Sequence, residues 1–313
     1  MSTVDTTRLS AAVPPLPAPE EAEPGEPDVP GTVAGARTSR PGAVRAGLRL
    51  LGSELGLTFR RPRNIVLIAL VTCVPVILGV VLRTVGGDED APSFVSAVAG
   101  NGLMLTFASM LMLVQLLLPL TVAVVAGDTV AGEASMGTLR YLLTAPAGRT
   151  RLLLLKFANV SIFAFVCCAL VAAAALITGF ALFPVGPVPL LSGGTISVFE
   201  GLLRVGVVVL YVTAGMAAFG AFGLAISTLT DVPIAAVAAS VVTVVFSQVM
   251  TLVPQLEVIR PYLLPSWWGS FDGALRDPVA TDVLGQGLLV FAAYILVFGS
   301  IAWSRFTSRD ITA

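Results

Sequence analysis

The chain has 313 residues, of which 56% are hydrophobic and only 12% are charged, and its formal net charge is −1. A soluble domain needs about 25% charged residues to solvate its surface, so this composition argues against an ordinary water-soluble protein and favours lipid as the solvent. The sequence contains no histidine, which excludes imidazole acid–base catalysis and histidine-ligated metal sites.

Residues 1–42 form a segment in which prolines are interleaved with acidic residues. Such a composition cannot bury a hydrophobic core, and it predicts a disordered cytosolic tail. The segment also lacks the basic start and the apolar run of a secretory signal peptide. Two roles stay open for it, a plain solvated tail and an interaction segment.

Residues 43–62 show the apolar spacing of a helix. Their apolar side chains recur at intervals of three and four residues, at Val44, Leu48, Leu51, Leu55 and Phe59. With Arg60, Arg61 and Arg63 following, the pattern predicts an amphipathic helix in the cytoplasmic headgroup layer. The alternative is an N-terminal extension of the first span, and a break at Pro62 favours the separate helix.

Six apolar segments follow, each near the roughly 20 residues needed to cross about 30 Å of hydrocarbon. The predicted spans are 64–83, 103–126, 157–183, 202–227, 233–253 and 284–303. The sequence therefore predicts an all-α integral membrane protein, with six transmembrane helices within residues 63–306. Only residues 228–232 separate the fourth and fifth spans, which predicts a tight antiparallel pair.

Basic residues are distributed unevenly around these spans. If both termini are cytoplasmic, most of the 18 Lys and Arg residues fall on the cytoplasmic side, as the positive-inside rule requires. The residues that fall on the outer side are Arg83, Arg204, Arg260 and Arg276. We therefore expect a multi-pass protein of the cell membrane with both termini inside, and an outer loop over residues 254–283.

The three cysteines, Cys73, Cys167 and Cys168, all lie inside apolar runs. Their spacing suits neither a CxxC metal site nor a disulfide framework, and we interpret them as small apolar side chains. We expect no catalytic, cofactor-binding or metal-binding residues on this chain, and no nucleic-acid partner.

Residues 127–156 form the predicted cytoplasmic loop between the second and third spans. Leu139, Leu142 and Leu143 lie on one side of a short amphipathic helix that Pro146 ends. Three basic residues, Arg149, Arg151 and Lys156, would flank the entry to the third span at the level of the lipid headgroups. The simpler alternative is a basic loop that only sets the topology.

The order of residues in this loop resembles the signature of ABC-2 type transporter permeases. In that family the loop after the second of six helices reads E-x3-GTL-x2-LL-x2-P-x2-R, followed by a lysine that opens the next helix. The matching residues here are Glu133, Gly137, Thr138, Leu139, Leu142, Leu143, Pro146, Arg149 and Lys156.

The resemblance implies that the loop is a coupling helix that contacts a separate ATP-binding-cassette ATPase subunit, and that the chain works as a dimer with a second permease copy. The ATPase contact would include Glu133, Gly137, Thr138, Leu139, Leu142, Leu143 and Pro146. Arg149, Arg151 and Lys156 would anchor the loop to membrane lipid. ATP and Mg would bind the partner, because this chain has a single lysine and no G-x4-GK[ST] motif. Gly137 and Thr138 could instead form only a helix kink or cap.

The outer loop contains adjacent tryptophans, Trp267 and Trp268. The resemblance implies short re-entrant helices here, whereas the physical alternative is an aromatic belt that anchors the sixth span at the interface. At the outer start of the fourth span, Glu200 and Arg204 stand one turn apart and predict a salt bridge.

Two other functions remain open on the sequence. A stand-alone secondary transporter or channel is one, although no buried relay of acidic and basic residues can be found within the spans. A non-transport membrane scaffold that uses the tail as its output is the other.

Overall fold

The computed structural model describes residues 42–85, 98, 100–137, 148–190 and 192–308. The predicted tail, residues 1–42, lies outside them except for its last residue. All the described residues belong to one compact unit that begins at Pro41. Apart from one pair of two-residue strands, the regular structure of the described residues is helical, which confirms the all-α prediction.

Nine α-helices occur in the described residues: α1 (Gly42–Arg60), α2 (Pro62–Val85), α4 (Met104–Gln115), α5 (Leu117–Ser135), α7 (Arg149–Leu182), α8 (Val198–Leu229), α9 (Pro233–Thr251), α10 (Pro265–Trp268) and α11 (Thr281–Ser308). The strands β1 (Val188–Pro189) and β2 (Thr195–Ile196) pair antiparallel. Three 3-10 helices, η1 (Pro254–Leu256), η2 (Arg260–Tyr262) and η3 (Ser270–Leu275), flank α10.

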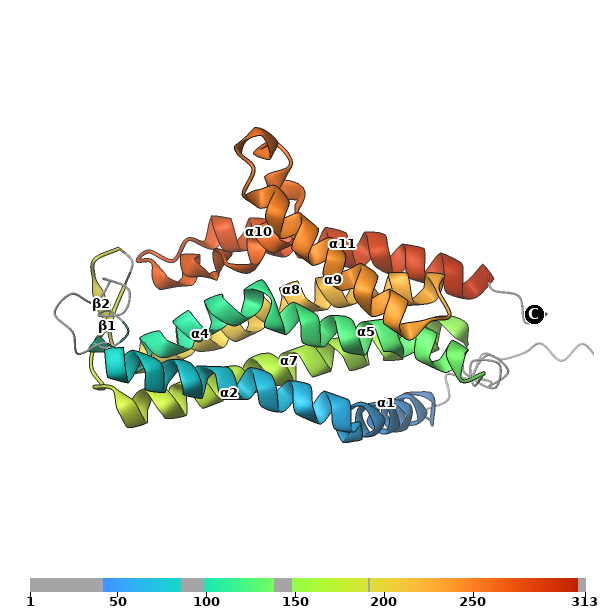
Figure 1. The fold of residues 1–313 in the computed structure, drawn as a ribbon, viewed down its shortest axis with the longest axis horizontal. Coiled ribbons are helices and arrows are strands. Elements are labelled where there is room, and N and C mark those ends of the chain that lie inside the picture. Colours follow the sequence, from blue (N-terminus) through green and yellow to red (C-terminus); the bar gives the residue numbers. More distant parts are fainter. Residues whose placement is uncertain (1–41, 86–97, 99, 138–147, 191, 309–313) are drawn as a thin grey trace, which may run out of the picture. The chain divides into compact units, whose positions relative to one another are not determined.

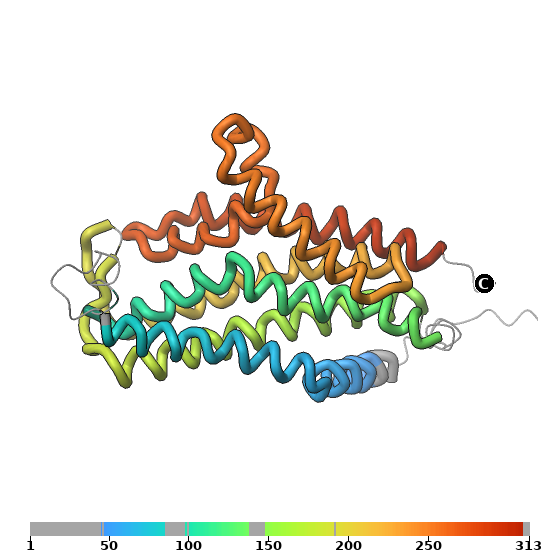
Figure 2. The backbone as a smooth tube through the Cα atoms, in the orientation of Figure 1, coloured from blue at the N-terminus to red at the C-terminus, as the bar shows by residue number. Residues whose placement is uncertain are grey.

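Six of these helices, α2, α5, α7, α8, α9 and α11, are long and apolar enough to cross a membrane. The chain is therefore a multi-pass membrane protein by the length and hydropathy of its helices. Figures 1 and 2 show the long helices running side by side, with α8 surrounded by α5, α7 and α11. We call the end of the bundle that carries α1 the α1 end and the opposite one the β end.

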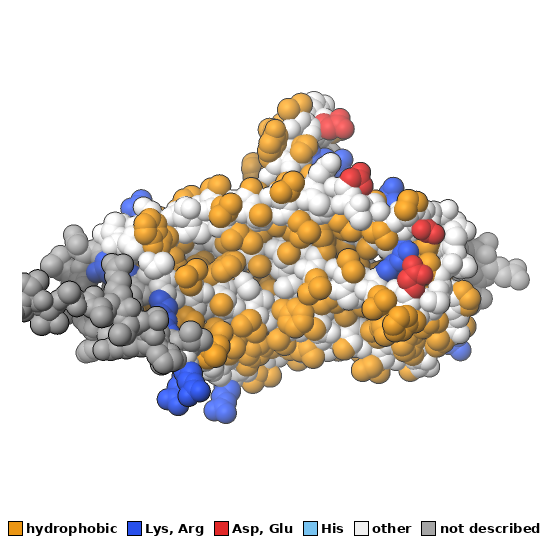
Figure 3. Space-filling view, turned by 180° about the vertical axis from the view of Figure 1, so that it is seen from behind, with side chains coloured by type: hydrophobic (Ala, Val, Ile, Leu, Met, Phe, Trp, Pro, Cys, Tyr) orange, Lys and Arg blue, Asp and Glu red, His pale blue; other side chains and the backbone are white. Residues whose placement is uncertain are grey.

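Hydrophobic side chains cover the middle of the bundle on the face seen in Figure 3, whereas charged side chains gather toward its ends and on the segment that projects from it. Exposed basic residues at the α1 end are Arg45, Arg49, Arg60, Arg61, Arg63 and Arg305. Exposed acidic residues at or beyond the other ends of the helices are Glu200, Glu257, Asp277 and Asp282, and the exposed Arg83, Arg260 and Arg276 also lie there. An apolar girdle between polar ends is the surface that a lipid bilayer requires.

The helix ends differ from the predicted spans most clearly around the loop 127–156. Helix α5 continues to Ser135, and α7 already begins at Arg149, so both flanks of the predicted loop are helical. Hydropathy marks where charges begin, but a helix continues as long as its backbone bonds and packing persist. Here α5 keeps packing against α8 and α9 beyond the apolar run.

The second predicted span is broken into α4 and α5 at Leu116, which has non-helical φ and ψ angles of −143° and −51°. Pro119 explains the break, because a proline ring clashes with the carbonyl four residues earlier, here that of Gln115. This carbonyl accepts a hydrogen bond from Gln248 Nε2 of α9 instead. A neighbouring helix thus satisfies a backbone group that lipid could not.

The turn between α8 and α9 is as short as predicted, since α8 ends at Leu229 and Pro233 begins α9. Glycines let neighbouring elements approach α8 closely. A Cβ atom at Gly215 would lie 2.9 Å from Trp268 Cδ1, and one at Gly220 would lie 2.7 Å from Val160 Cγ1. The small residues of α8 therefore serve packing within the chain at these positions.

The segment between α9 and α11 contains four short helices, η1, η2, α10 and η3, and their re-entrant position in a membrane stays a prediction. Its tryptophans differ from the predicted aromatic belt, because Trp268 is fully buried and packs edge-on against Phe219. Trp267 is partly exposed, and its Nε1 donates to Pro261 O over 2.8 Å. The belt interpretation is wrong for Trp268, since α10 folds its ring back onto α8.

The predicted salt bridge at the start of α8 is confirmed, with Arg204 Nη2 2.7 Å from Glu200 Oε1. Arg204 is also buried, and its Nη1 donates to the carbonyl oxygens of Ala274 and Arg276. The guanidinium therefore ties α8 to the end of η3. Cys167 and Cys168 are buried and Cys73 is exposed on α2, and none of the three forms a disulfide.

Candidate functional site

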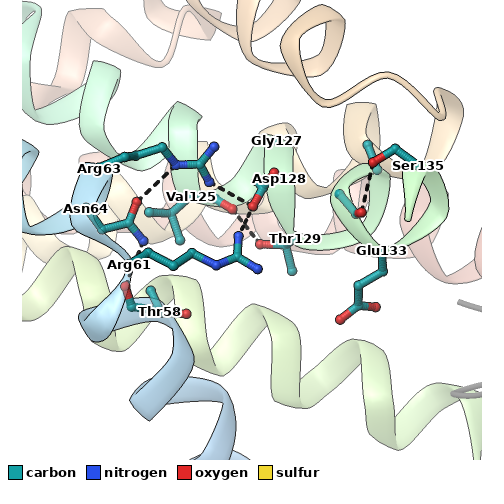
Figure 4. A network of polar contacts seen from close by, with 12 residues as sticks. Thr58, Arg61, Arg63, Asn64, Val125, Gly127, Asp128, Thr129, Glu133 and Ser135 are labelled. Atoms are coloured by element: carbon teal, nitrogen blue, oxygen red, sulfur yellow. Dashed lines mark hydrogen bonds and ion pairs between the residues drawn. The ribbon is translucent and has the colours of Figure 1, made fainter. Parts of the chain in front are cut away.

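Within the described residues, six charged side chains gather at the α1 end, where α1, α2, α5 and α7 meet around a cavity of about 50 Å³. We call it the polar junction. Its polar side chains are Glu54, Thr58, Arg61, Arg63, Asn64, Asp128, Thr129, Glu133, Lys156 and Asn159. Figure 4 shows that both arginines from the α1–α2 connection point toward Asp128 of α5, with Glu133 further along the same helix.

Asp128 of α5 binds both arginines of the α1–α2 connection. Its Oδ2 atom pairs with Arg61 Nη1 and lies 2.7 Å from Arg63 Nη2. Pro62 stands between them as the first residue of α2, where a missing N–H group costs no helical hydrogen bond. The bend at Pro62 therefore presents both guanidinium groups to one carboxylate.

Lys156 of α7 is the buried cation of the junction, with only 1% of its side chain exposed. Its Nζ lies 2.5 Å from Glu133 Oε1 of α5 and 3.8 Å from Glu54 Oε1 of α1. It also donates to Thr129 O over 3.1 Å. A buried ammonium group needs such partners, because desolvation without them costs several kcal/mol.

Uncharged side chains of α1, α2 and α7 also contact one another in the junction. Asn159 Nδ2 of α7 donates to Thr58 Oγ1 of α1 over 2.8 Å, and Asn64 Nδ2 of α2 donates to Thr58 O over 2.8 Å. All three side chains are buried. Thr58 therefore links three helices at the point where α1 turns into α2.

Helix α8 is joined to the same part of α5 by Ser227. Its hydroxyl donates to Gly127 O over 2.7 Å and accepts from the N–H groups of Val130 and Ala131. A side-chain oxygen inserted among backbone groups locally alters the helical ladder. The stretch of α5 that carries Asp128 is thereby fixed to the end of α8.

The composition of the junction limits what it can do. Three cations, Arg61, Arg63 and Lys156, are balanced by three carboxylates, those of Glu54, Asp128 and Glu133. A cavity of about 50 Å³ has room for a few water molecules, since one needs about 10–15 Å³ by this measure. The described residues contain no group of three or more His, Cys, Asp or Glu that could hold a metal ion. The arrangement can hold helices together, but it is too small for an organic substrate.

The structure brings together two of the residues that the sequence singled out, Glu133 and Lys156. The expected lipid contact of Lys156 does not fit this geometry, because its ammonium group is buried against carboxylates. Glu133, expected at the ATPase contact, has 17% of its side chain exposed and faces Lys156. Its basic character beside an apolar run marked Lys156 as a headgroup residue, because the sequence pattern does not show that acids from two other helices, Glu54 of α1 and Glu133 of α5, face it.

The other predicted residues lie around the junction or outside the described part. Gly137 has a φ angle of +69° and ends α5, which is the cap geometry that glycine favours. Arg149 Nη1 donates to Thr307 O of α11 over 2.7 Å, and the Arg151 guanidinium lies against Gly47 of α1. Thr138, Leu139, Leu142, Leu143 and Pro146 lie outside the described residues, so the predicted short helix is not among them.

Sequence reasoning missed Asp128, Glu54 and the two arginines as partners. The available signal was an acidic residue, Asp128, in an otherwise apolar span beside the basic flank of another span. The partners of Asp128 could not be predicted from the sequence, because Arg61 and Arg63 stand 67 and 65 positions before it.

A family model described as a protein of unknown function, DUF2705, matches residues 66–312, which include most of α2, all of the other long apolar helices and the α5–α7 side of the junction. The chain belongs to the DUF2705 family. No curated protein matches it. The match begins within α2, so the DUF2705 region contains Asp128, Glu133 and Lys156, whereas Glu54, Arg61 and Arg63 precede it.

Proposed function

We propose that this DUF2705 chain is the permease subunit of an ATP-binding-cassette exporter, driven by a separate ATPase. The observation that carries the proposal is the place of the signature in the fold. Glu133 and Lys156, near its two ends, lie 2.5 Å apart at the base of the segment that joins α5 to α7. The residues between them would touch the ATPase, and this ion pair would hold the stem of that contact.

The lengths of the helices support a mechanical role for this stem. Helix α7 has 34 residues and α8 has 32, which makes them ~51 Å and ~48 Å long. Since the hydrocarbon layer is about 30 Å thick, both project beyond it. A helix is stiff, so a displacement at the cytoplasmic end of α7 would be carried through the bilayer.

The polar junction would spread such a displacement to α1 and α2. Lys156 links α7 to Glu54 of α1, and Asp128 links α5 to Arg61 and Arg63. ATP-driven closure of the ATPases would therefore move α1, α2, α5 and α7 together and change access between the two sides of the membrane.

Hydrolysis of ATP, with its Mg²⁺, belongs to the partner in this proposal, and this chain contributes no catalytic residue. The exposed basic residues at the α1 end support a cytoplasmic position for that end, where an ATPase would be found. A second permease copy, identical or homologous, would complete the complex in the cell membrane.

Affinity purification of the full chain from its own membranes tests the proposal. We expect a nucleotide-binding subunit to co-purify, and Leu139→Asp to weaken this association because it places a charge on the apolar side of the signature. Val258→Asp is the matched control, since Val258 is 82% exposed between η1 and η2, far from the signature.

Two results would contradict the proposal. One is the absence of any ATPase from the purified complex, together with transport that responds to an ion gradient and survives loss of the ATPase, as a secondary transporter or channel predicts. The other is a chain whose cellular role depends on residues 1–40 alone, as a membrane scaffold predicts.

A further inference from the structure

Helix α1 packs against the bundle with one face only. Gly47, Glu54 and Thr58 are spaced seven and four residues apart, so they align on one side of a helix. All three contact residues of α7, and two of them belong to the polar junction. The opposite face of α1 therefore points away from the bundle.

Three arginines, Arg45, Arg49 and Arg60, align on this opposite face, which we call the basic face of α1. All three are exposed. Among the described residues, none of the three forms an ion pair. Figure 3 shows basic side chains that project from the bundle at the α1 end. Such a face attracts a partner with negative charge.

Exposed leucines flank the basic face. Leu48 is 64% exposed on one side of it, and Leu50 and Leu57 are 41% and 63% exposed on the other. A partner that covers both kinds of side chain must offer negative charge together with apolar surface. A membrane of anionic lipid offers both. The acidic stretch of this chain, residues 20–28 with four Glu and one Asp, offers charge but little apolar surface.

The place of α1 in the fold brings it to the level of the lipid headgroups. Helix α1 ends at Arg60, and Pro62 begins α2, which is long and apolar enough to span a membrane. In Figure 1, α1 is strongly foreshortened whereas α2 and α7 run across the page, so α1 lies crosswise to them. A helix that runs crosswise at the start of a span lies along the membrane surface.

We propose that the basic face of α1 binds the anionic lipid surface of the surrounding membrane. The guanidinium groups of Arg45, Arg49 and Arg60 bind lipid phosphates with charge-assisted hydrogen bonds, and the leucines beside them contact acyl chains. Each arginine near such a surface strengthens the association about fivefold. The position of α1 thus depends on the charge of the membrane. The inference does not depend on the proposed transport function.

A fluorescent label on α1 of the full chain tests this binding. Bimane is attached to Gly52→Cys, an exposed position where a Cβ meets no atom within 4 Å. Cys73→Ser removes the exposed native thiol, and Cys167 and Cys168 are buried. The protein is placed in lipid nanodiscs of phosphatidylcholine alone, or of equal phosphatidylglycerol and phosphatidylcholine. We expect weaker quenching by neutral acrylamide in the discs with phosphatidylglycerol, and about 1 M salt should remove the difference.

Variants with three substitutions separate the basic face from the other charges of the chain. Glutamine at Arg45, Arg49 and Arg60 together should abolish the difference between the two kinds of disc, whereas lysine at the same positions should keep it, because lysine keeps the charge. The matched control replaces three exposed arginines at or beyond the other ends of the helices and should keep the difference; its substitutions are Arg83→Gln, Arg260→Gln and Arg276→Gln.

Equal quenching in the two kinds of disc overturns the proposal, and so does a difference that survives the loss of the three arginines of α1. Loss of the difference in the control variant overturns it too, because the label would then respond to total charge. A further variant replaces the four Glu of residues 20–28 with Gln. If quenching changes with this variant and not with phosphatidylglycerol, the acidic stretch covers the basic face, which also contradicts the proposal.

Discussion

Lys156 Nζ and Glu133 Oε1 lie 2.5 Å apart, although 23 positions separate the two residues. The ammonium group is buried on α7 and the carboxylate faces it from α5. The pair closes the stem of the segment between these helices, and Glu54 of α1 approaches the same ammonium to 3.8 Å. Lys156 therefore connects α7 to both α1 and α5 at the α1 end.

Replacing Lys156 with methionine should destabilise the protein strongly. The substitution keeps an unbranched side chain that is one atom shorter but leaves the carboxylate of Glu133 without its nearest cation, and breaking a buried pair typically costs about 3–5 kcal/mol. Thermal unfolding in detergent, followed by tryptophan fluorescence, measures the change as a lower transition temperature.

Glu133→Gln combined with Lys156→Met is the control for this prediction. The double variant removes both charges, so we expect it to unfold at a higher temperature than Lys156→Met alone. If both variants unfold at the temperature of the unaltered protein, Lys156 does not stabilise the junction.

Asp128→Asn should loosen the bend between α1 and α2 with little loss of global stability. Arg61 and Arg63 are 44% and 46% exposed, and ion pairs at such positions contribute at most about 1 kcal/mol each. We expect faster hydrogen exchange in residues 58–66 and a nearly unchanged unfolding temperature. Asp272→Asn, which removes the exposed pair with Arg276 at 3.5 Å, should leave that exchange unaltered. Unaltered exchange in Asp128→Asn as well would show that Asp128 does not hold the bend.

The sequence predicted the helices well because apolar runs of sufficient length have few alternatives in lipid. Thus the turn between α8 and α9 and the Glu200–Arg204 pair were predictable from local spacing. The break at Leu116 was less predictable, since a proline such as Pro119 can bend a helix but only the side chain of Gln248 shows how the freed carbonyl is satisfied.

The candidate site was predictable only in part, for a physical reason. Hydropathy places Lys156 near a membrane surface, but it cannot distinguish a lysine that faces lipid phosphates from one that faces Glu133 and Glu54. Trp268 shows the same limit, because burial under a folded-back short helix leaves no periodic pattern. Partners that are distant in the sequence decide both cases.

Gln248→Leu should weaken the packing of α9 against the break between α4 and α5. The Gln115 carbonyl would lose the side chain that donates a hydrogen bond to it, and interhelical bonds of this kind contribute about 0.6–2 kcal/mol in membranes. We expect a lower unfolding temperature and faster hydrogen exchange around Leu116. Thr243→Val is the control, since the Thr243 hydroxyl bonds only within α9, to Ala239 O. A normal unfolding temperature for Gln248→Leu would show that the bond is not needed.

Gly179→Ala should destabilise the β end, where α7 meets Gly102, two residues before α4. A Cβ at Gly179 would collide with the carbonyl oxygen of Gly102, which is backbone and cannot rotate away. Overpacking of this kind costs about 1–3 kcal/mol, so we expect a lower unfolding temperature.

Gly206→Ala on α8 is the control, because its Cβ meets nothing within 4 Å and alanine favours a helix by about 0.5–1 kcal/mol over glycine. Gly206→Ala should therefore unfold at the same or a higher temperature. Equal transition temperatures for Gly179→Ala and Gly206→Ala would contradict the close approach of Gly102 and Gly179.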